Sequence, residues 1–156
     1  MEPVAYVSST RRQPVDDNWD AEQSSIVLVT GYSPEALAGL ASFSHVEVVY
    51  VFHQVEPEDI VSGARHPRGI RDWPLTGIFA QRGRNRPNRL GVTICRLVQV
   101  EGLTIQVSGL DAIDGTPVLD VKPVMREFLP RGEVVQPHWS KELMREYWMR
   151  ADHRNA

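Results

Sequence analysis

The sequence predicts a mainly β protein: a small antiparallel barrel or curled sheet with short peripheral helices and a C-terminal helix. Roughly five to seven short segments are apolar and β-branched, and glycine, proline or polar residues separate them. Two of these segments flank a tight turn at Glu101 and Gly102, which indicates a hairpin. Helical spacing of apolar residues occurs over two short stretches. Many short strands with little helix are typical of antiparallel barrels.

Two strands are expected near the N-terminus, at residues 4–8 and 25–29. The residues between them are mostly polar and include a proline, so they predict a loop. Trp19 is unusual in such a loop, because a large aromatic side chain generally packs against other groups. Either Trp19 covers an edge of the core, or it lines a ligand pocket with residues 16–18, Asp-Asp-Asn. The role of the stretch from Asp16 to Trp19 stays open.

A short helix is expected after the second strand. Ser33 suits a helix cap, and Pro34 suits a first helical turn. Leu37, Leu40 and Ala41 then form an apolar stripe at helical spacing.

The strongest strand signal lies at residues 46–52, which are β-branched or aromatic nearly throughout and predict a buried central strand. His53 and Gln54 follow it, where ligand contacts are common and a satisfied edge histidine fits equally well. Residues 56–74 predict a loop. Further strands are expected at residues 77–80, 92–100, 103–108 and 117–121. A helix from Ser140 to Arg150, capped by Ser140, is expected to dock on the barrel or on a neighbouring subunit.

Two polar loops flank the predicted hairpin, at residues 77–91 and 109–123. The first loop carries Arg82, Arg84, Arg86 and Arg89, and the second carries Asp111, Asp114 and Asp120. Because a hairpin brings its two ends together, we expect these loops to meet in space. Fixed positive charge on one side and carboxylates on the other predict a site for a small charged ligand.

The composition is that of one globular domain. A chain of 156 residues is long enough for one core, and we expect a barrel domain at residues 1–130 and a C-terminal extension with a short helix at residues 131–156. The net charge of -3 argues against a bulk polyanion-binding protein. From Arg65 to Arg89, however, seven arginines face the single acid Asp72. This basic stretch suits a phosphate-bearing partner, and it suits a solvated loop equally well.

Several classes of site are not expected. The single cysteine, Cys95, lies in an apolar segment, which predicts a buried inert thiol and no disulfide framework. The five histidines lack metal-binding spacing, so no metal site is expected. The sequence shows no signal peptide and no apolar run of about 18 residues, so we expect a cytoplasmic protein without membrane contact. Dinucleotide-binding, P-loop and G-x-S-x-G motifs are missing, which leaves a Rossmann domain and a nucleophilic hydrolase unsupported.

Three motifs resemble one known family. They are FHQ at residues 52–54, GIFAQR…NRPN…LGVT at residues 77–93 and GLDAIDGTPVLDVKP at residues 109–123. All three are similar to the TsaA-like (TrmO) family, and the resemblance covers roughly residues 6–123. It implies a small β-barrel that binds S-adenosylmethionine near a homodimer interface. It also implies N6-methylation of a threonylcarbamoyl-modified adenosine next to the tRNA anticodon.

The resemblance implies a set of site residues. The cofactor contacts would be His53, Gln54, Arg82, Leu90, Asp111, Asp114, Gly115 and Thr116. An arginine can pair with the methionine carboxylate, and acidic groups can hold the ammonium group and the ribose. No catalytic side chain is assigned, because methyl transfer depends chiefly on aligning the acceptor with the methyl group. The arginines expected to contact RNA are Arg65, Arg68, Arg84 and Arg89.

The sequence also departs from the family pattern. Gln81 stands where the family usually has Thr or Ser, and Arg89 and Leu90 replace the usual Pro and Ile. Val121 and Val124 stand where the family usually has Ile and Tyr. We expect Gln81 and Arg89 to alter the pocket rim and the choice of acceptor. The alternatives are therefore a methyltransferase that acts on a small molecule or another acceptor, and a non-catalytic regulatory protein that binds S-adenosylmethionine.

Overall fold

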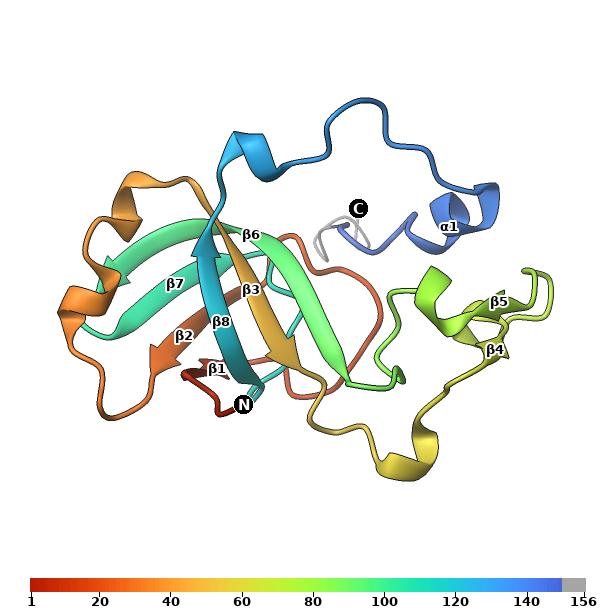
Figure 1. Cartoon of the computed structure of the whole chain (residues 1–156), viewed down its shortest axis with the longest axis horizontal. Helices are drawn as coiled ribbons and strands as arrows, with labels where there is room; N and C mark the ends of the chain where they lie inside the picture. The colour runs from red at the N-terminus through yellow and green to blue at the C-terminus, as the bar shows by residue number, and fades with distance from the viewer. Residues whose placement is uncertain (150–156) are drawn as a thin grey trace, which may run out of the picture.

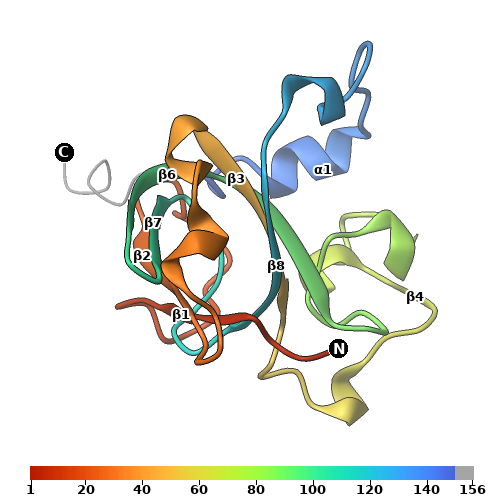
Figure 2. The same ribbon diagram turned by 60° about the vertical axis from the view of Figure 1, so that its left-hand side comes forward.

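A computed structural model describes residues 1–149, and its central feature is a closed antiparallel barrel, which confirms the predicted fold class. Its strands are β1 (Ala5–Ser8), β2 (Gln23–Leu28), β3 (His45–Val51), β6 (Leu90–Glu101), β7 (Thr104–Ser108) and β8 (Pro117–Pro123). Their order around the barrel is β1-β2-β7-β6-β3-β8, and β8 pairs with β1 to close it (Figures 1 and 2). The predicted strands at residues 4–8, 25–29, 46–52, 92–100, 103–108 and 117–121 are all present, with small shifts at their ends.

Strand β6 contributes to two sides of the barrel. Its first part, from Leu90 to Arg96, pairs with β3, and its last part, up to Glu101, pairs with β7. The register shifts between Leu97 and Gln99, and such irregularities bend a strand. The predicted hairpin turn follows, where Gly102 has a φ of 58° at the first loop position, as in a type II′ turn.

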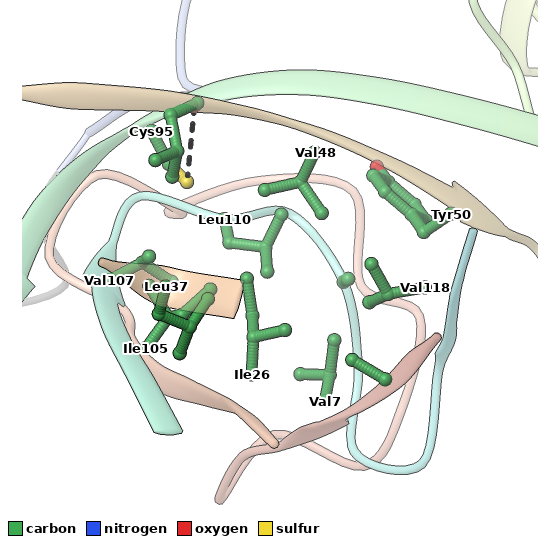
Figure 3. Packing of buried hydrophobic residues seen from close by; sticks show 13 residues of the cluster. Val7, Ile26, Leu37, Val48, Tyr50, Cys95, Ile105, Val107, Leu110 and Val118 are labelled. Carbon is green, nitrogen blue, oxygen red and sulfur yellow. Dashed lines mark hydrogen bonds between the residues drawn. The ribbon is translucent and has the colours of Figure 1, made fainter. Parts of the chain in front are cut away.

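The core lies inside the barrel, where each strand directs alternate side chains. In β3, Val46, Val48 and Tyr50 point inward, while the residues between them are only partly buried. Ile26 on β2 lies directly opposite Ile105 on β7, and both are 0% exposed. Figure 3 shows Ile26 and Ile105 converging with Leu110 and Val118 on the barrel interior. Because alternate side chains of each strand face the core, strands of five to seven residues such as β3 and β7 can form the barrel wall.

Cys95 belongs to this core, as its apolar surroundings predict. Its side chain is 3% exposed, and its sulfur lies 3.8 Å from the Val46 carbonyl oxygen (Figure 3). Burial raises the pKa of the thiol to about 12. The thiol therefore stays protonated at neutral pH, and a protonated thiol is a poor nucleophile.

The prediction of a helix after Ser33 is wrong. The chain instead makes two 3-10 turns, η1 (Pro34–Leu37) and η2 (Leu40–Ser42). Gly39 lies between them with a φ of 84°, a left-handed conformation that interrupts a helix. The Ser33 side chain makes no capping hydrogen bond, although Leu37 packs into the core.

The prediction of a strand at residues 77–80 is also largely wrong. Only Thr76–Gly77 (β5) is extended, and it pairs with Ala64–Arg65 (β4) in a small separate sheet. Ile78–Ala80 (η5) is a 3-10 turn that buries Ile78. The predicted loop at residues 56–74 thus contains β4 and two further 3-10 turns, η3 (Pro57–Asp59) and η4 (Pro67–Gly69). The arginine-rich region projects beside the barrel (Figure 1).

The C-terminal helix is shorter than predicted. After a 3-10 turn at Arg126–Phe128 (η6), helix α1 spans His138–Leu143, and turns follow up to Trp148. Pro137 has the extended N-cap conformation, so Ser140 lies inside the helix and donates to the Pro137 carbonyl at 2.8 Å. The predicted end at Arg150 lies outside the described residues. In residues 1–149, no helix combines the length and the apolar character that crossing a membrane requires.

Candidate functional site

The centre of the site is the carboxylate of Asp111, just after the buried residue Leu110. The Tyr50 hydroxyl donates to Asp111 Oδ1 at 2.9 Å, and the Thr93 hydroxyl donates to the same oxygen. The Tyr147 hydroxyl donates to Oδ2. Inward-facing positions on β3 and β6 explain the first two contacts, because Tyr50 and Thr93 are both buried. Three hydroxyl groups from three separate segments therefore converge on one carboxylate.

Both tyrosines of this cluster stay protonated. Burial raises the pKa of Tyr50 well above its ordinary value, and the charge of Asp111 adds to the shift. Burial and then the same charge raise the pKa of Tyr147. Each phenol is therefore a hydrogen-bond donor, rather than a base, throughout the physiological pH range.

Arg82 brings the arginine loop to this cluster. Its guanidinium donates to the Val92 carbonyl at 2.7 Å, one residue before Thr93. It lies close enough to Tyr50 for its charge to lower the pKa of that phenol, in opposition to the larger effects of burial and Asp111. The exposed cation of one predicted loop and the carboxylate of the other therefore lie in one region of the molecule.

The DGTP turn is held by its own polar groups. Asp114 accepts a hydrogen bond from the Ser9 amide at 3.0 Å, and the Thr116 hydroxyl donates to the Ile113 carbonyl at 2.7 Å. Gly115 has a φ of 78°, and its amide donates to the Val7 carbonyl at 2.8 Å. The Gly115 amide thus joins the turn to β1, Asp114 joins it to the residue after β1, and the Thr116 hydroxyl closes it internally. The predicted contacts of these residues with a cofactor stay a prediction.

His53, another residue predicted to bind the cofactor, lies beside this turn. A Cβ atom at Gly115 would lie 3.9 Å from His53 Nε2, so the imidazole borders the glycine. Gln54 is exposed beside it. Leu90 begins β6 with its side chain 38% exposed on the outer surface, next to the Val92 that anchors Arg82 through its carbonyl.

The four arginines predicted to contact RNA lie in different environments. Arg68 forms an ion pair with Asp17 at 3.0 Å, which engages much of its charge within the chain. Arg65 packs its guanidinium against Gly83, and its Nε is buried without a hydrogen-bond partner. Arg89 donates to the Val55 carbonyl at 2.9 Å. Arg84 is exposed, and its one described hydrogen bond is a long contact of 3.5 Å with the Pro14 carbonyl.

Gln81 does not lie on a pocket rim, so that expectation is wrong. Its side chain is 8% exposed and donates to the carbonyls of Arg65 and Thr76 at 3.1 and 2.7 Å. Arg86 in turn donates to the Gln81 carbonyl at 2.9 Å. Gln81 therefore fastens the arginine loop to the β4–β5 sheet.

Sequence reasoning missed Arg11. Its guanidinium lies 3.5 Å from the centre of the Trp19 ring and donates to the carbonyls of Val15, Asp17 and Asn18. Trp19 is 3% exposed, so it packs against the protein instead of facing an open pocket. Burial lowers the pKa of Arg11, and neighbouring carboxylates, among them Glu22 and Asp111, oppose that shift. The signal in the sequence was an arginine and a tryptophan within one polar loop.

The C-terminal segment docks on the loops of its own barrel. The amide of Trp19 donates to the Tyr147 carbonyl at 2.9 Å, and the amide of Asn18 donates to the Glu146 carbonyl at 3.1 Å. The Trp73 indole donates to Glu142 at 2.8 Å. Docking on the barrel of its own chain, one of the two predicted alternatives for this segment, is thus present in the structure.

The described surface also has features away from these residues, among them a cavity of about 500 Å³ lined by residues 127–131. Within residues 1–149 there is no group of three or more His, Cys, Asp or Glu side chains arranged to hold a metal ion. A shallow cavity of about 250 Å³ lies between Asp20, His45, Arg96 and Trp148. None of the residues predicted to bind the cofactor lines this cavity.

Comparison with known proteins places these features in a family. The family described as tRNA-methyltransferase O N-terminal domain matches residues 6–128. The human tRNA (adenine(37)-N6)-methyltransferase is 37% identical over 144 residues, which are 87% of this chain and 32% of that protein. A probable S-adenosyl-L-methionine-binding protein of Methanothermobacter thermautotrophicus is 36% identical over 127 residues, 79% of this chain and 88% of that protein.

A solved structure has the same fold. The crystal structure of TrmO from Pseudomonas aeruginosa matches with a TM-score of 0.70 and 29% identity, over 86% of this chain and 59% of that one. The chain spans only about a third of the human relative and about three fifths of the Pseudomonas protein. Since the family match extends over most of the barrel and both polar loops, the chain belongs to the tRNA-methyltransferase O N-terminal domain family.

Proposed function

We propose that this protein binds S-adenosylmethionine and transfers its methyl group to N6 of a threonylcarbamoyl-modified adenosine next to the tRNA anticodon. The observation that carries the proposal is that Asp111, an anion held by three hydroxyls, and the exposed cation Arg82 both lie near Tyr50. The cofactor carries both an ammonium group and a carboxylate. The name of the human relative supports the reaction, and the name of the Methanothermobacter relative supports the cofactor.

The residues present fit this cofactor. A carboxylate accepts about four hydrogen bonds, and the three hydroxyls on Asp111 leave room for one donor, such as an ammonium group or a ribose hydroxyl. Arg82 uses one of its nitrogens on Val92, which leaves others for a ligand carboxylate. The missing side chain at Gly115 keeps space beside His53. Leu90 offers exposed apolar surface for an adenine ring.

The reaction asks little covalent chemistry of the protein. When bound, S-adenosylmethionine supplies an electrophilic methyl group on a sulfonium centre. The side chains around Asp111 then need to fix the ligand and align the acceptor nitrogen. Because the acceptor nitrogen is itself the nucleophile, the reaction needs no serine or cysteine nucleophile from the protein.

The first test is calorimetric titration with S-adenosylmethionine. We expect the Arg82→Ala variant to bind about tenfold more weakly than the wild type, a loss of about 1.4 kcal/mol, because one charge-assisted contact disappears. Arg126→Ala, an exposed arginine in η6, is the matched control and should bind like the wild type. Absence of binding by the wild-type protein would contradict the proposed function.

The acceptor is tested with tRNA. We expect Arg84→Ala to reduce the methylation rate at low tRNA concentration about threefold, and to lower the salt dependence of tRNA binding by about one unit of slope, because one phosphate contact is lost. Arg126→Ala again serves as the control. An unchanged rate would remove the RNA role of Arg84, and methylation of small molecules alone would identify a different acceptor.

We also propose a homodimer. Support comes from a row of exposed apolar side chains on the outer face of β6, namely Leu90, Val92, Ile94 and Val98, which are 37–54% exposed. Light scattering should give a mass of twice 17.6 kDa, and the mass of one chain would contradict the dimer. A cytoplasmic location is part of the same proposal and is checked by fractionating cells.

A further inference from the structure

Tyr147 lies outside the part of the chain that matches the family, which ends at residue 128. Its hydroxyl nevertheless reaches the centre of the candidate site. Asp111 Oδ1 is occupied by Tyr50 and Thr93 from the barrel wall, whereas Oδ2 accepts its hydrogen bond from Tyr147. The two oxygens of one carboxylate are thus held by two different parts of the protein.

The position of Tyr147 is fixed by its backbone. The Tyr147 carbonyl accepts from the Trp19 amide at 2.9 Å, and the preceding carbonyl accepts from the Asn18 amide at 3.1 Å. Its ring makes an edge contact with Trp148 at 4.9 Å between ring centres. The phenol therefore reaches Asp111 from a segment that two backbone hydrogen bonds hold against residues 18 and 19.

We propose that Tyr147 is a positioning residue of the S-adenosylmethionine site, and this inference rests on the function proposed above. Tyr50 and Thr93 hold only one oxygen of Asp111, so they leave the carboxylate free to rotate about that anchored oxygen. The Tyr147 hydroxyl fixes the second oxygen and leaves one acceptor position directed to the ligand. The C-terminal segment is then part of the binding site and not a separate appendage.

The test removes the hydroxyl alone. Tyr147→Phe keeps the ring and its packing, and we expect it to bind S-adenosylmethionine about fivefold more weakly in calorimetry, because Asp111 is less well oriented. Tyr32→Phe is the matched control, since Tyr32 is 44% exposed in the loop after β2, and it should bind like the wild type. Equal affinity of Tyr147→Phe and the wild type would overturn the inference and leave the proposed function intact.

A mutant cycle distinguishes positioning from general structural support. If Tyr147 acts through Asp111, then Tyr147→Phe should weaken binding no further in an Asp111→Ala background, as read by thermal shift at millimolar S-adenosylmethionine. An equal loss in both backgrounds would overturn the inference. Tighter binding by Tyr147→Phe would overturn it too, because the hydroxyl would then block the ligand. Absence of binding by the wild type would remove the proposed function and this inference together.

Discussion

Gly91→Ala should destabilise the protein and disturb the site at the same time. A Cβ atom at Gly91 would lie 2.5 Å from carbons of the Tyr50 ring and 2.9 Å from its hydroxyl. Tyr50 is 2% exposed inside the barrel, so its ring cannot move away without displacing its neighbours. Overpacking of this kind costs about 1–3 kcal/mol. Replacing glycine recovers only about 0.4–1 kcal/mol through the less flexible unfolded chain.

Urea unfolding and calorimetry together test this prediction. We expect a net loss in the free energy of unfolding of about 1–2 kcal/mol, and S-adenosylmethionine binding at least tenfold weaker, because Tyr50 anchors Asp111. Gly63→Ala is the matched control, since a Cβ there meets no atom within 4 Å and the backbone is not left-handed. If Gly91→Ala kept normal stability and affinity, the Tyr50 ring could move to accommodate the methyl group, and the prediction would be wrong.

Of the proposed substitutions, Asp111→Ala should weaken S-adenosylmethionine binding most. The substitution removes the anion of the site, and hydrogen bonds to charged groups contribute about 1.5–3 kcal/mol each. We therefore expect S-adenosylmethionine affinity to fall about a hundredfold, or about 2.7 kcal/mol. The buried hydroxyls of Tyr50 and Thr93 also lose their shared acceptor, so stability should fall by about 1–3 kcal/mol.

The control for this variant comes from the same stretch of sequence. Asp120 lies on β8 with a half-exposed side chain paired to Lys122, and Asp120→Ala should leave cofactor affinity unchanged. Surface ion pairs of this type contribute about 0–1 kcal/mol to stability. If Asp111→Ala and Asp120→Ala bound equally well, Asp111 would have no direct part in the site.

The barrel was predictable because the sequence pattern of each strand lies within a few neighbouring residues. Residues 46–52 and 103–108 carry their strand pattern within a few positions, and Gly102 marks the turn. The 3-10 turns were not predictable in the same way. At Gly39 a single left-handed residue divides an apparent helix, and at Ile78 a buried side chain is packed by a turn instead of a strand.

The candidate site was predictable only in part, for a related reason. Asp111 and Arg82 lie in loops at the two ends of one hairpin, so their approach follows from neighbouring strands. Arg11, Thr93 and Tyr147 reach the same region from segments far apart in the sequence, and no local pattern indicates that they meet at Asp111. Gln81 was misjudged because an amide in a polar loop gives no indication that it is buried.

The seam of the barrel has a consequence for the speed of folding. Strand β1 pairs with β8 through Ala5 with Val118 and Tyr6 with Pro117, residues from opposite ends of the domain. Contacts between such distant residues require a large loop to close before they contribute any stability. During synthesis, β1 can pair with β2 early, but its other edge waits until β8 has emerged. The barrel should therefore close late and in one cooperative step, on a timescale of about milliseconds to seconds.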